Sequence, residues 1–449
     1  MSVPRYERYK ASGIEWLGNV PEHWSVVPLK RVGRLKAGAG FPHEAQGVQG
    51  EEISFHKVNA IAQAAADGFL LPSENTVSRE TAARLGAFIF PPGTIVFAKI
   101  GAALLLGRIR LLREPSCIDN NMMGLITDQP NCVGFLRYLM HLVKFDLIVN
   151  PGAVPSLSEG QVAEFRISVP PIVEQLAIAA FLDRETAKID ALVDEQRRLI
   201  ELLEEKRQAV ISHTVTKGLD PNAPLKDSGV EWLGQVPEHW EVCALKRLCT
   251  TITDGAHISP ETENGVFCFV STKDLVGEGI DFDGCLRTSE ASYEYLVRTG
   301  CQPRRGDVLF SKDGTVGRTV VVHEDREFVV ASSLIIIRPD QRLLNAAFLH
   351  KLCQSHLVGN QVESYVKGAG LPRLSIQNLL KVVGVFPPIP EQLAIAAFLD
   401  QETAKIDELA QAAERGIALL QERCTALISA AVTGKIDVRG AAPAAAEAA

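Results

Sequence analysis

Two long stretches of the chain place apolar residues at a helical spacing and lack helix breakers. From Glu174 to about His213 there is no glycine or proline, and apolar side chains recur about every 3.5 residues. The stretch after Pro387-Pro388 repeats this pattern, interrupted at Gly416 and Arg423. Each stretch predicts a helix of about 40 residues, roughly 60 Å long. The apolar seam positions are Ile189, Leu192, Leu199, Leu203, Val210, Ile406, Leu409, Ala413, Leu420 and Leu427.

Neither predicted helix is apolar all round, so each needs a partner along its stripe. Because the two stripes are nearly identical, mutual pairing as a coiled coil is favoured. The alternative is two separate amphipathic helices, each packed on its own domain.

The segments outside these helices follow a different pattern. FIFPPGTIVFAKI, GDVLFSKDGTVGRTVVV and SSLIIIRP are short β-branched runs separated by Gly, Pro and Asp-Gly turns. Such runs predict mixed α/β domains without fixing the order of their strands. The fold class expected for the whole chain is therefore α+β.

The chain is a tandem duplication. SGIEWLGNVPEHW from Ser12 returns as SGVEWLGQVPEHW from Ser228, and EQLAIAAFLDRETAKID from Glu174 returns from Glu391 with one change. Between these repeats the two copies diverge and keep only islands. In these islands Lys99 aligns with Lys312, PSLS from Pro155 aligns with PRLS from Pro372, and Lys57 aligns with Lys273. The duplication predicts one framework that carries two different surfaces.

Charge does not identify the partner. The chain has 46 Lys and Arg against 54 Asp and Glu, a net charge of −8. Residues 25–170 hold 14 basic and 12 acidic residues, and residues 241–387 hold 16 and 17, which leaves 16 and 25 elsewhere. The two divergent blocks are thus close to neutral, which neither supports nor excludes binding to nucleic acid.

Several functional classes lack their motifs. The nine cysteines form no CxxC pair, and no His or Cys cluster has metal-ligand spacing. There is no Walker loop, no HExxH and no Asn-Pro-Pro-aromatic tetrad, and AGAGF from Ala37 lacks the strand and helix of a cofactor-binding turn. No apolar run is long enough for a membrane helix, and the first residues do not resemble a signal peptide. We expect a non-catalytic cytoplasmic protein without a metal.

The combined motifs resemble the specificity subunit of a type I restriction-modification system. The matching features are the EWLGxVPEHW box, the KDGT turn at Lys312–Thr315, the PxLS motif before each Pro-Pro pair, and the EQLAIAAFLD–ETAKID helices. The resemblance implies two target-recognition domains separated by two long antiparallel helices. Each domain would read one half of a bipartite site on double-stranded DNA.

The resemblance also implies partners and cofactors. Two methyltransferase subunits would dock on this chain, and restriction/translocase subunits would join them for cleavage. S-adenosylmethionine, ATP and magnesium are expected only in those partner subunits, with no cofactor in this chain and no membrane partner.

The expected domain organisation follows the repeats. It comprises the first box with the first target-recognition domain at 1–170, a spacer helix at 171–215, a linker with the second box at 216–240, the second target-recognition domain at 241–387, the second spacer helix at 388–433 and a disordered Ala-rich tail at 434–449. Antiparallel pairing would give the repeat a pseudo-twofold axis, as DNA backbones have. We expect the four tryptophans, Trp16, Trp24, Trp232 and Trp240, to pack each domain against the helices.

Residues that read bases should be polar, lie on loops and differ between the copies, whereas phosphate contacts can be shared. By this criterion Lys99 and Lys312 suit phosphate contact. For every candidate, a solvated surface loop is the alternative interpretation. The candidate DNA-binding residues are His43, Gln46, His56, Lys57, Asn59, Lys99, Arg108, Arg110, Asp254, His257, Ser259, Ser271, Lys273, Asp274, Arg304, Arg305, Lys312, Asp313, Thr315 and Arg373.

Two other functions fit the sequence. The first is a coiled-coil adaptor whose near-neutral domains bind proteins rather than DNA. The second is the specificity half of a nicking or single-chain restriction enzyme whose catalytic half is encoded separately.

Overall fold

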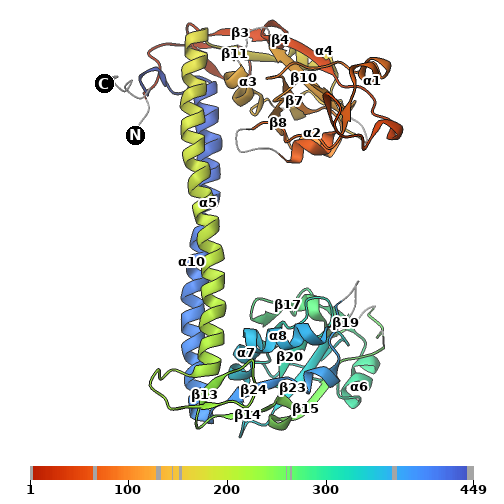
Figure 1. The fold of residues 1–449 in the computed structure, drawn as a ribbon, viewed down its shortest axis with the longest axis vertical. Coiled ribbons are helices and arrows are strands. Elements are labelled where there is room, and N and C mark those ends of the chain that lie inside the picture. Colours follow the sequence, from red (N-terminus) through yellow and green to blue (C-terminus); the bar gives the residue numbers. More distant parts are fainter. Residues whose placement is uncertain are drawn as a thin grey trace. The chain divides into compact units, whose positions relative to one another are not determined.

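The computed structural model describes residues 4–63, 68–127, 133–143, 145–150, 154–258, 260–262, 265–366 and 372–441. The chain divides into two compact units. Unit 1 comprises residues 1–195 and 416–449, and unit 2 comprises residues 196–415. Two long helices, α5 (Ile172–Lys217) and α10 (Ile389–Val432), each contribute one part to unit 1 and one part to unit 2 (Figure 1). Both predicted helices are confirmed.

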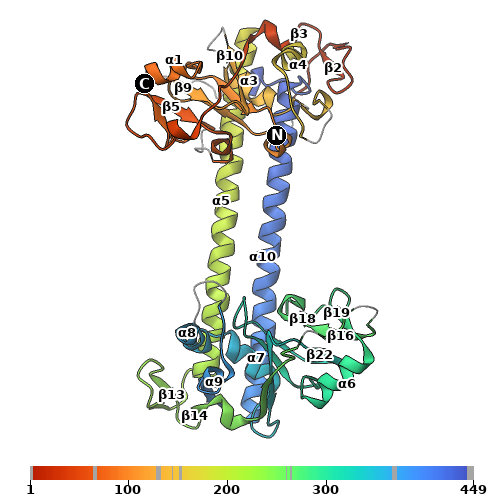
Figure 2. The same cartoon turned by 90° about the vertical axis from the view of Figure 1, so that its right-hand side faces the viewer.

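Segments of α5 and α10 run antiparallel within each unit (Figures 1 and 2). In unit 2, the Arg207 Nε donates to Asp407 Oδ1 at 3.1 Å, and Gly218 lies beside the Glu391 carboxylate. Residue numbers therefore rise along α5 as they fall along α10. In unit 1, Ile178, Phe181 and Leu182 of α5 share a core with Ala431 and Val432 of α10.

The structure corrects three of the predicted seam positions. Leu192, Leu199 and Leu409 are 45%, 41% and 56% exposed. Their next neighbours turn inward instead: Val193 is buried, and Ile200 and Ala410 are half-buried. Both the third and the fourth residue after a seam position lie near the seam, so the apolar pattern alone cannot choose between them. The other predicted positions are buried or half-buried: Ile189, Leu203, Val210, Ile406, Ala413, Leu420 and Leu427.

Unit 1 contains a four-stranded antiparallel sheet and a three-stranded sheet. The first has the order β4–β10–β7–β8, and the second has the order β6–β5–β9 with β5 and β9 parallel. The strands are β4 (Gly33–Ala37), β5 (Ile53–His56), β6 (Thr76–Val77), β7 (Ile95–Ala98), β8 (Ile109–Leu111), β9 (Ser116–Ile118) and β10 (Met122–Thr127).

Unit 2 repeats this arrangement strand by strand. Its four-stranded sheet has the order β15–β23–β20–β21, and its three-stranded sheet has the order β19–β16–β22 with β16 and β22 parallel. The strands are β15 (Cys249–Asp254), β16 (Phe267–Val270), β19 (Leu286–Thr288), β20 (Val308–Ser311), β21 (Thr319–Val321), β22 (Phe328–Val330) and β23 (Leu334–Pro339). Unit 2 adds a hairpin of β17 (Leu275–Val276) and β18 (Gly279–Ile280).

Each repeated box forms a short hairpin followed by a strand that pairs with the segment leading into a long helix. Both hairpins and both of these pairs are antiparallel. In unit 1 the strands are β1 (Tyr9–Ala11), β2 (Asn19–Pro21), β3 (Ser25–Pro28) and β11 (Arg166–Val169). In unit 2 they are β12 (Leu225–Asp227), β13 (Gln235–Pro237), β14 (Glu241–Ala244) and β24 (Val383–Phe386).

The short helices also correspond between the units. Ala82 of α1 packs on β5 and β9, and Leu296 of α6 packs on β16 and β22 (Figure 2). In the described part of the chain, none of the helices combines the length and the apolar character that a membrane crossing requires. The short helices are α1 (Arg79–Arg84), α2 (Ala102–Leu105), α3 (Val133–Met140), α4 (Glu159–Glu164), α6 (Glu290–Arg298), α7 (Ala346–Gln354), α8 (His356–Tyr365) and α9 (Ile376–Leu379).

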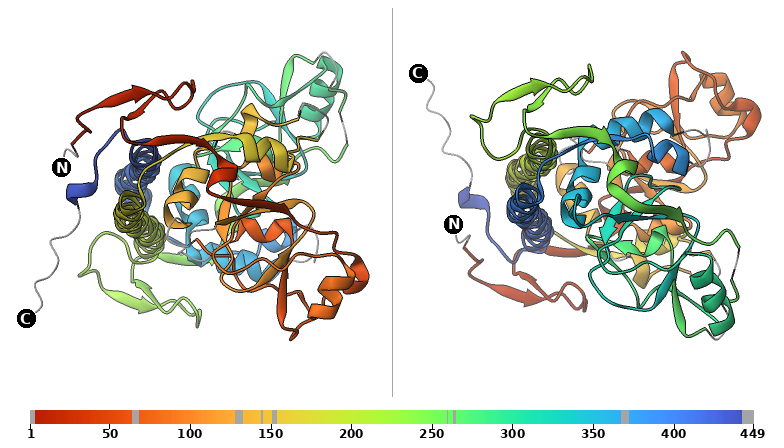
Figure 3. Two further views of the ribbon diagram at one scale, coloured as in Figure 1. Left: turned by 90° about the horizontal axis from the view of Figure 1, so that it is seen from above. Right: turned by 90° about the horizontal axis from the view of Figure 1, so that it is seen from below.

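The first and last described segments meet in unit 1 (Figure 3). The amide of Asp437 donates to the carbonyl of Pro4 at 2.7 Å, and Val438 is buried in the core of unit 1. The prediction of a disordered tail from residue 434 is therefore wrong for residues 434–441, because an apolar side chain anchors them. Residues 442–449 of that predicted tail lie outside the described residues.

Candidate nucleic-acid interface

A glycine fixes the same backbone crossing in both units. A Cβ on Gly255 would lie 2.2 Å from the carbonyl oxygens of Val330 and Ala331. On Gly38 it would lie 2.1 Å from the carbonyl oxygen of Asp119. Real Cβ atoms do not approach so closely, so only glycine permits the loops after β4 and β15 to cross the ends of β9 and β22.

A lysine loop follows β7 in unit 1 and β20 in unit 2, and the two loops have the same backbone hydrogen bonds. The amide of Lys99 donates to Asn121 O at 2.8 Å, and the amide of Lys312 donates to Ser333 O at 2.9 Å. The lysine carbonyls accept from Leu157 and Leu374, both at 2.9 Å. The PxLS segments are thereby attached to the lysine loops in the same way in both units.

This shared framework defines equivalent positions on the two loops and the PxLS segment. Unit 2 carries Asp254, His257, Lys312, Asp313 and Arg373 where unit 1 carries Ala37, Gly40, Lys99, Ile100 and Ser156. Only the lysine is common to both. The five unit 2 residues are called the polar cluster below.

Within the polar cluster, the carboxylate of Asp254 binds the side chains of both Lys312 and His257. Its Oδ2 lies 2.5 Å from Lys312 Nζ and 2.7 Å from His257 Nε2. Burial by itself would raise the pKa of the Asp254 carboxyl, but the hydrogen bond and the charge of Lys312, with His257, lower it on balance. Asp254 therefore stays ionised and fixes the exposed His257 ring.

The second carboxylate of the polar cluster holds an arginine. Arg373 Nε donates to Asp313 Oδ1 at 2.6 Å, and its Nη2 donates to Oδ2 at 3.0 Å. This bidentate pair is charge-assisted on both bonds. The Arg373 side chain is 63% exposed, whereas that of Asp313 is 12% exposed. The loop thus presents an exposed guanidinium that the less exposed Asp313 carboxylate binds along one edge.

The polar cluster corrects the expectation that Lys312 contacts phosphate. Its side chain is only 8% exposed, and its ammonium is bound to Asp254. A lysine neutralised in this way supports a neighbouring side chain rather than a phosphate. Lys99 is half-buried, and within the described residues its ammonium has no hydrogen bond or ion pair, so its predicted phosphate contact stays a prediction.

In unit 1 the candidates lie in several places. Gln46 accepts from Lys57 Nζ at 2.9 Å and donates to Phe41 O at 2.8 Å, while His43 and Asn59 are exposed. The prediction for His56 is wrong, because its ring is 3% exposed in the core. Burial lowers its pKa to about 4, so the ring is neutral near pH 7.

The alignment of Lys57 with Lys273 is also wrong. The amide of Asp119 donates to His56 O, and the amide of Ala331 donates to Val270 O, which makes His56 the equivalent of Val270. The number of residues that separates equivalent positions of the two repeats changes along the chain. Only the strand register shows where it changes, so the sequence alone aligned the two lysines.

The remaining candidates do not join the polar cluster. Ser271 and Asp274 form a capping box, with the Ser271 amide and hydroxyl both 2.8 Å from Asp274 Oδ2, so Asp274 is buried as a local structural group. Lys273 and Thr315 are exposed, and Ser259 lies outside the described residues. Arg304 and Arg305 precede β20, whereas Lys312 follows it. Arg108 is exposed, and Arg110 is half-buried with Nη1 on Ile109 O.

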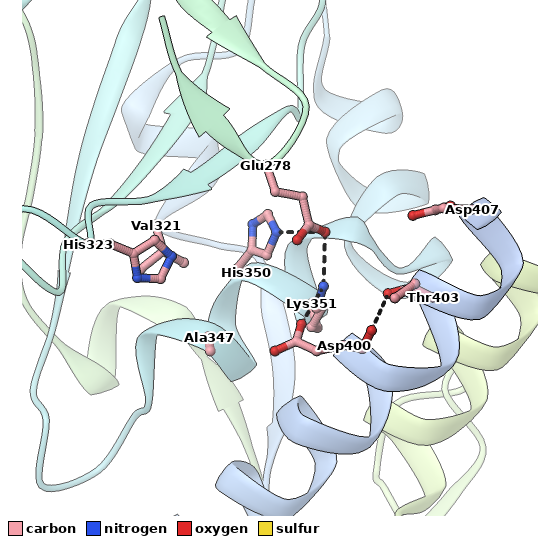
Figure 4. Close-up of a pocket in the computed structure, with 10 residues that line it drawn as sticks. Glu278, Val321, His323, Ala347, His350, Lys351, Asp400, Thr403 and Asp407 are labelled. Carbon is pink, nitrogen blue, oxygen red and sulfur yellow. Dashed lines mark hydrogen bonds and ion pairs between the residues drawn. The ribbon is translucent and has the colours of Figure 1, made fainter. Parts of the chain in front are cut away.

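The structure shows one buried group that the sequence did not single out. Lys351 of α7 is 1% exposed, and its Nζ lies 3.0 Å from Glu278 Oε1 and 2.8 Å from Asp400 Oδ1 (Figure 4). His350, whose Nε2 lies 3.7 Å from Glu278 Oε1, holds the pKa of Glu278 well below its usual range together with Lys351 and against the effect of burial. This group ties the β17–β18 hairpin and α7 to α10.

Unit 1 makes the equivalent connection with other residues. Tyr138 of α3 donates from its hydroxyl to Asp183 Oδ1 at 2.7 Å, and Arg137 Nη2 lies 2.7 Å from the same oxygen. Asp183 and Asp400 occupy the same position of the repeated EQLAIAAFLD segment. The identity of Asp183 and Asp400 was the signal that could have found these connections. An aspartate retained at the same position of both helices indicates a polar partner on each domain.

The box attaches each domain to the start of a long helix. Trp24 Nε1 donates to Glu174 at 3.0 Å, and Trp240 Nε1 donates to Glu391 at 3.1 Å. These two tryptophans are fully buried, as expected. Trp16 stacks on Phe165 with ring centroids 5.6 Å apart. The expectation is wrong for Trp232, which is 57% exposed because the tip of its hairpin extends away from the core.

These geometries define what the loops can do. The polar cluster presents an imidazole and a guanidinium, each held by a carboxylate, which suits hydrogen bonding to a polar edge. Among the described residues, no group of three or more His, Cys, Asp or Glu side chains is arranged to hold a metal ion.

Comparison with known proteins gives consistent matches. Residues 21–202 and 237–415 each match the family described as type I restriction modification DNA specificity domain. The chain is 22% identical over 457 residues to the type I restriction enzyme EcoKI specificity subunit of Escherichia coli strain K12, covering 94% of this chain and 91% of that protein. It is 22% identical over 294 residues to the EcoBI specificity subunit of Escherichia coli, covering 64% of this chain and 61% of that protein. The latter match thus spans less than two thirds of its relative.

A solved structure shares the fold. This structure is described as the structural basis of complex assembly and conformational transition of the type I R-M system. Its superposition on this chain has a TM-score of 0.67 at 18% sequence identity. The match covers 92% of this chain and 98% of that one.

Proposed function

Because the chain belongs to the family of type I restriction modification DNA specificity domains and carries that domain twice, we propose that it is a sequence-specific DNA-binding specificity subunit. Unit 1 reads one half of a bipartite site, and unit 2 reads the other half. Helices α5 and α10 set the number of unread base pairs between the halves. The chain itself performs no catalysis and acts in the cytoplasm, where its DNA target lies.

One observation carries this proposal. The two units share the glycine crossing and the lysine-loop hydrogen bonds, yet four of five equivalent side chains at these loops differ. A framework that is kept while its exposed polar groups change is what reading two different base sequences requires, because bases are distinguished by hydrogen bonds to their edges.

The repeated surfaces support the proposed partners. The box hairpins and the EQLAIAAFLD segments are almost identical in the two units, so they offer the same docking surface twice. Two copies of a methyltransferase subunit fit this duplication, and restriction/translocase subunits complete the complex for cleavage. S-adenosylmethionine, ATP and magnesium bind to those subunits in this proposal.

A domain exchange tests the division of labour. Residues 25–170 are replaced by the equivalent segment of a relative with a different target, and the chain is expressed with its methyltransferase in a host free of DNA methylation. Sequencing of modified bases should show that one half of the methylated site changes and the other stays. The control is the reciprocal exchange of residues 241–387. A change in both halves, or in neither, contradicts the proposal.

A change in helix length tests the spacing role. Seven residues with helical propensity, one heptad, are inserted after Val193 in α5 and at the matching level of α10, so that the seam is kept. The bases of both half-sites should stay, and the gap between them should lengthen. An unchanged gap rejects this role of the helices.

Salt dependence distinguishes DNA reading from a protein adaptor. The complex with the methyltransferase should lose affinity for its duplex steeply as salt rises, because counterions are released on binding. Binding without that dependence favours the adaptor.

A further inference from the structure

Among the residues that the structure describes, the Asp313–Arg373 pair leaves one edge of the guanidinium without a partner. Asp313 accepts from Nε and Nη2, which form the side edge of the group. The end edge consists of one N–H of Nη1 and the second N–H of Nη2, and no described residue accepts a hydrogen bond from it. Since the Arg373 side chain is 63% exposed, this end edge can reach a ligand outside the protein.

Among the base pairs of DNA, guanine offers the acceptor pair that fits this edge. Its N7 and O6 lie side by side in the major groove and accept two parallel N–H bonds from one arginine. We propose that Arg373 reads a guanine in the half-site of unit 2, and that Asp313 is a positioning residue that orients the guanidinium. This inference rests on the proposed DNA-reading function.

The backbone around the pair is fixed before any ligand binds. Asp313 and Arg373 form an isolated antiparallel bridge, the Gly314 amide donates to Pro372 O at 3.1 Å, and the Leu374 amide donates to Lys312 O at 2.9 Å. A side chain held in its bound orientation loses less conformational freedom on binding. Such an arginine discriminates between bases better than a mobile one.

Unit 1 provides the internal contrast. Ile100 and Ser156 occupy the positions of Asp313 and Arg373, while the bridge between them is retained. The loop connection therefore does not require the ion pair. The guanine requirement from this position should thus appear in one half of the site only.

The first experiment compares variants of the full chain in complex with its methyltransferase. Arg373→Ala should accept other bases at one guanine position of the unit 2 half-site, with a loss of roughly 5- to 150-fold in discrimination, and Arg373→Lys should lose less of it. Asp313→Asn should lose part of it. The control is Arg342→Ala, which removes an exposed arginine of unit 2 that is paired with Asp340 after β23. It should leave the methylated sequence unchanged.

The second experiment uses the wild-type complex, so it does not depend on the folding of a variant. Replacing that guanine by 7-deazaguanine removes the N7 acceptor. The affinity of the wild-type complex should fall roughly 10-fold or more, as expected for one hydrogen bond to a charged group. The Arg373→Ala complex should be insensitive to the replacement, because alanine has no donor for N7.

The outcomes distinguish a failure of the proposed DNA-binding function from a failure of the inference about Arg373. If the wild-type complex methylates no bipartite sequence, the proposed function fails. If it does so and Arg373→Ala keeps every base, or relaxes a base other than guanine or a base in the unit 1 half, the inference is overturned. A uniform loss of affinity for all sequences, without a 7-deazaguanine effect, assigns Arg373 to a phosphate and also overturns it.

Discussion

Unit 1 and unit 2 hold Lys99 and Lys312 by the same backbone hydrogen bonds but surround them with different side chains. In unit 2 the lysine is buried against Asp254, and the neighbouring Asp313 orients Arg373. In unit 1 the corresponding positions are Ala37, Ile100 and Ser156. The comparison shows that the lysine was retained with the framework, whereas its chemical role depends on the residue that faces it.

The junction with the long helices behaves in the opposite way. Both units bury a tryptophan and direct its indole N–H to a glutamate at the start of a long helix. The residues here are identical because they attach each domain to its helix. Specificity and attachment are thus assigned to separate parts of the same domain.

The largest expected effect is at the junction. Trp24→Ala and Trp240→Ala should each lower the stability of their own unit by about 3–5 kcal/mol, because each removes a fully buried aromatic ring. Hydrogen exchange, resolved by peptide, should show lost protection in the mutated unit. Trp232→Ala is the matched control, since its ring is 57% exposed, and should change stability by less than about 0.5 kcal/mol. Equal effects of Trp232→Ala and Trp240→Ala would refute the assignment of the junction.

The second-largest expected effect is a difference between the two units in how their stability depends on pH. Burial lowers the pKa of His56 from 6.5 to about 4, while Val270 occupies the equivalent position in unit 2. Between pH 6.5 and 4 the unfolded state gains a proton that folded unit 1 does not bind. The stability of unit 1 therefore falls over this window, by up to about 3 kcal/mol, and this contribution is constant below it.

His56→Val, which places the unit 2 residue in unit 1, should reduce this slope without abolishing it, because the pKa of His141 in the same unit is also lowered to about 4. The measurement is the free energy of opening of unit 1 peptides by hydrogen exchange as a function of pH. An unchanged slope in the variant contradicts the assignment to His56.

The contacts of α3 and α7 with the long helices sharpen the comparison further. Lys351→Met should destabilise unit 2 by about 1–2 kcal/mol, because it leaves Glu278 and Asp400 without their shared cation, although both carboxylates are about half exposed and therefore screened. Tyr138→Phe should cost unit 1 about 1 kcal/mol, the usual value of a hydrogen bond. Urea unfolding monitored by hydrogen exchange measures both.

The control for this pair is Lys405→Met, which removes an exposed ion pair with Glu402 on α10. It should have an effect below about 0.5 kcal/mol. If Lys351→Met is no more destabilising than this control, the buried lysine does not connect the hairpin to α10.

The smallest effect concerns the two shared lysines. Lys99→Ala should reduce the slope of log affinity against log salt by about 1, because a phosphate contact is lost. Lys312→Ala should leave the slope unchanged, since its ammonium is already neutralised by Asp254. Titration of the methyltransferase complex with target duplex at several salt concentrations measures both slopes. Equal slopes for the two variants would show that the lysines have the same role.

Much of the fold followed from local patterns. The β-branched runs around Val96 and Leu309 contain strands, and the two glycine-free stretches form α5 and α10. Such patterns report backbone conformation directly, because strand and helix periods differ. The phase of the helix seam was not determined by them: Leu192 and Val193 are equally apolar, and only the position of the partner helix selects Val193.

The sequence determined the candidate site less completely than it determined the fold. The sequence by itself established the duplication, the family resemblance and the candidacy of Asp254, His257, Asp313 and Arg373 as polar loop residues. Only the tertiary structure decided that these residues meet, that Lys312 is buried among them and that His56 belongs to the core. The physical reason is that ion pairs between residues 58 or 60 positions apart depend on strand register and loop crossing, which leave no periodic trace in a single chain.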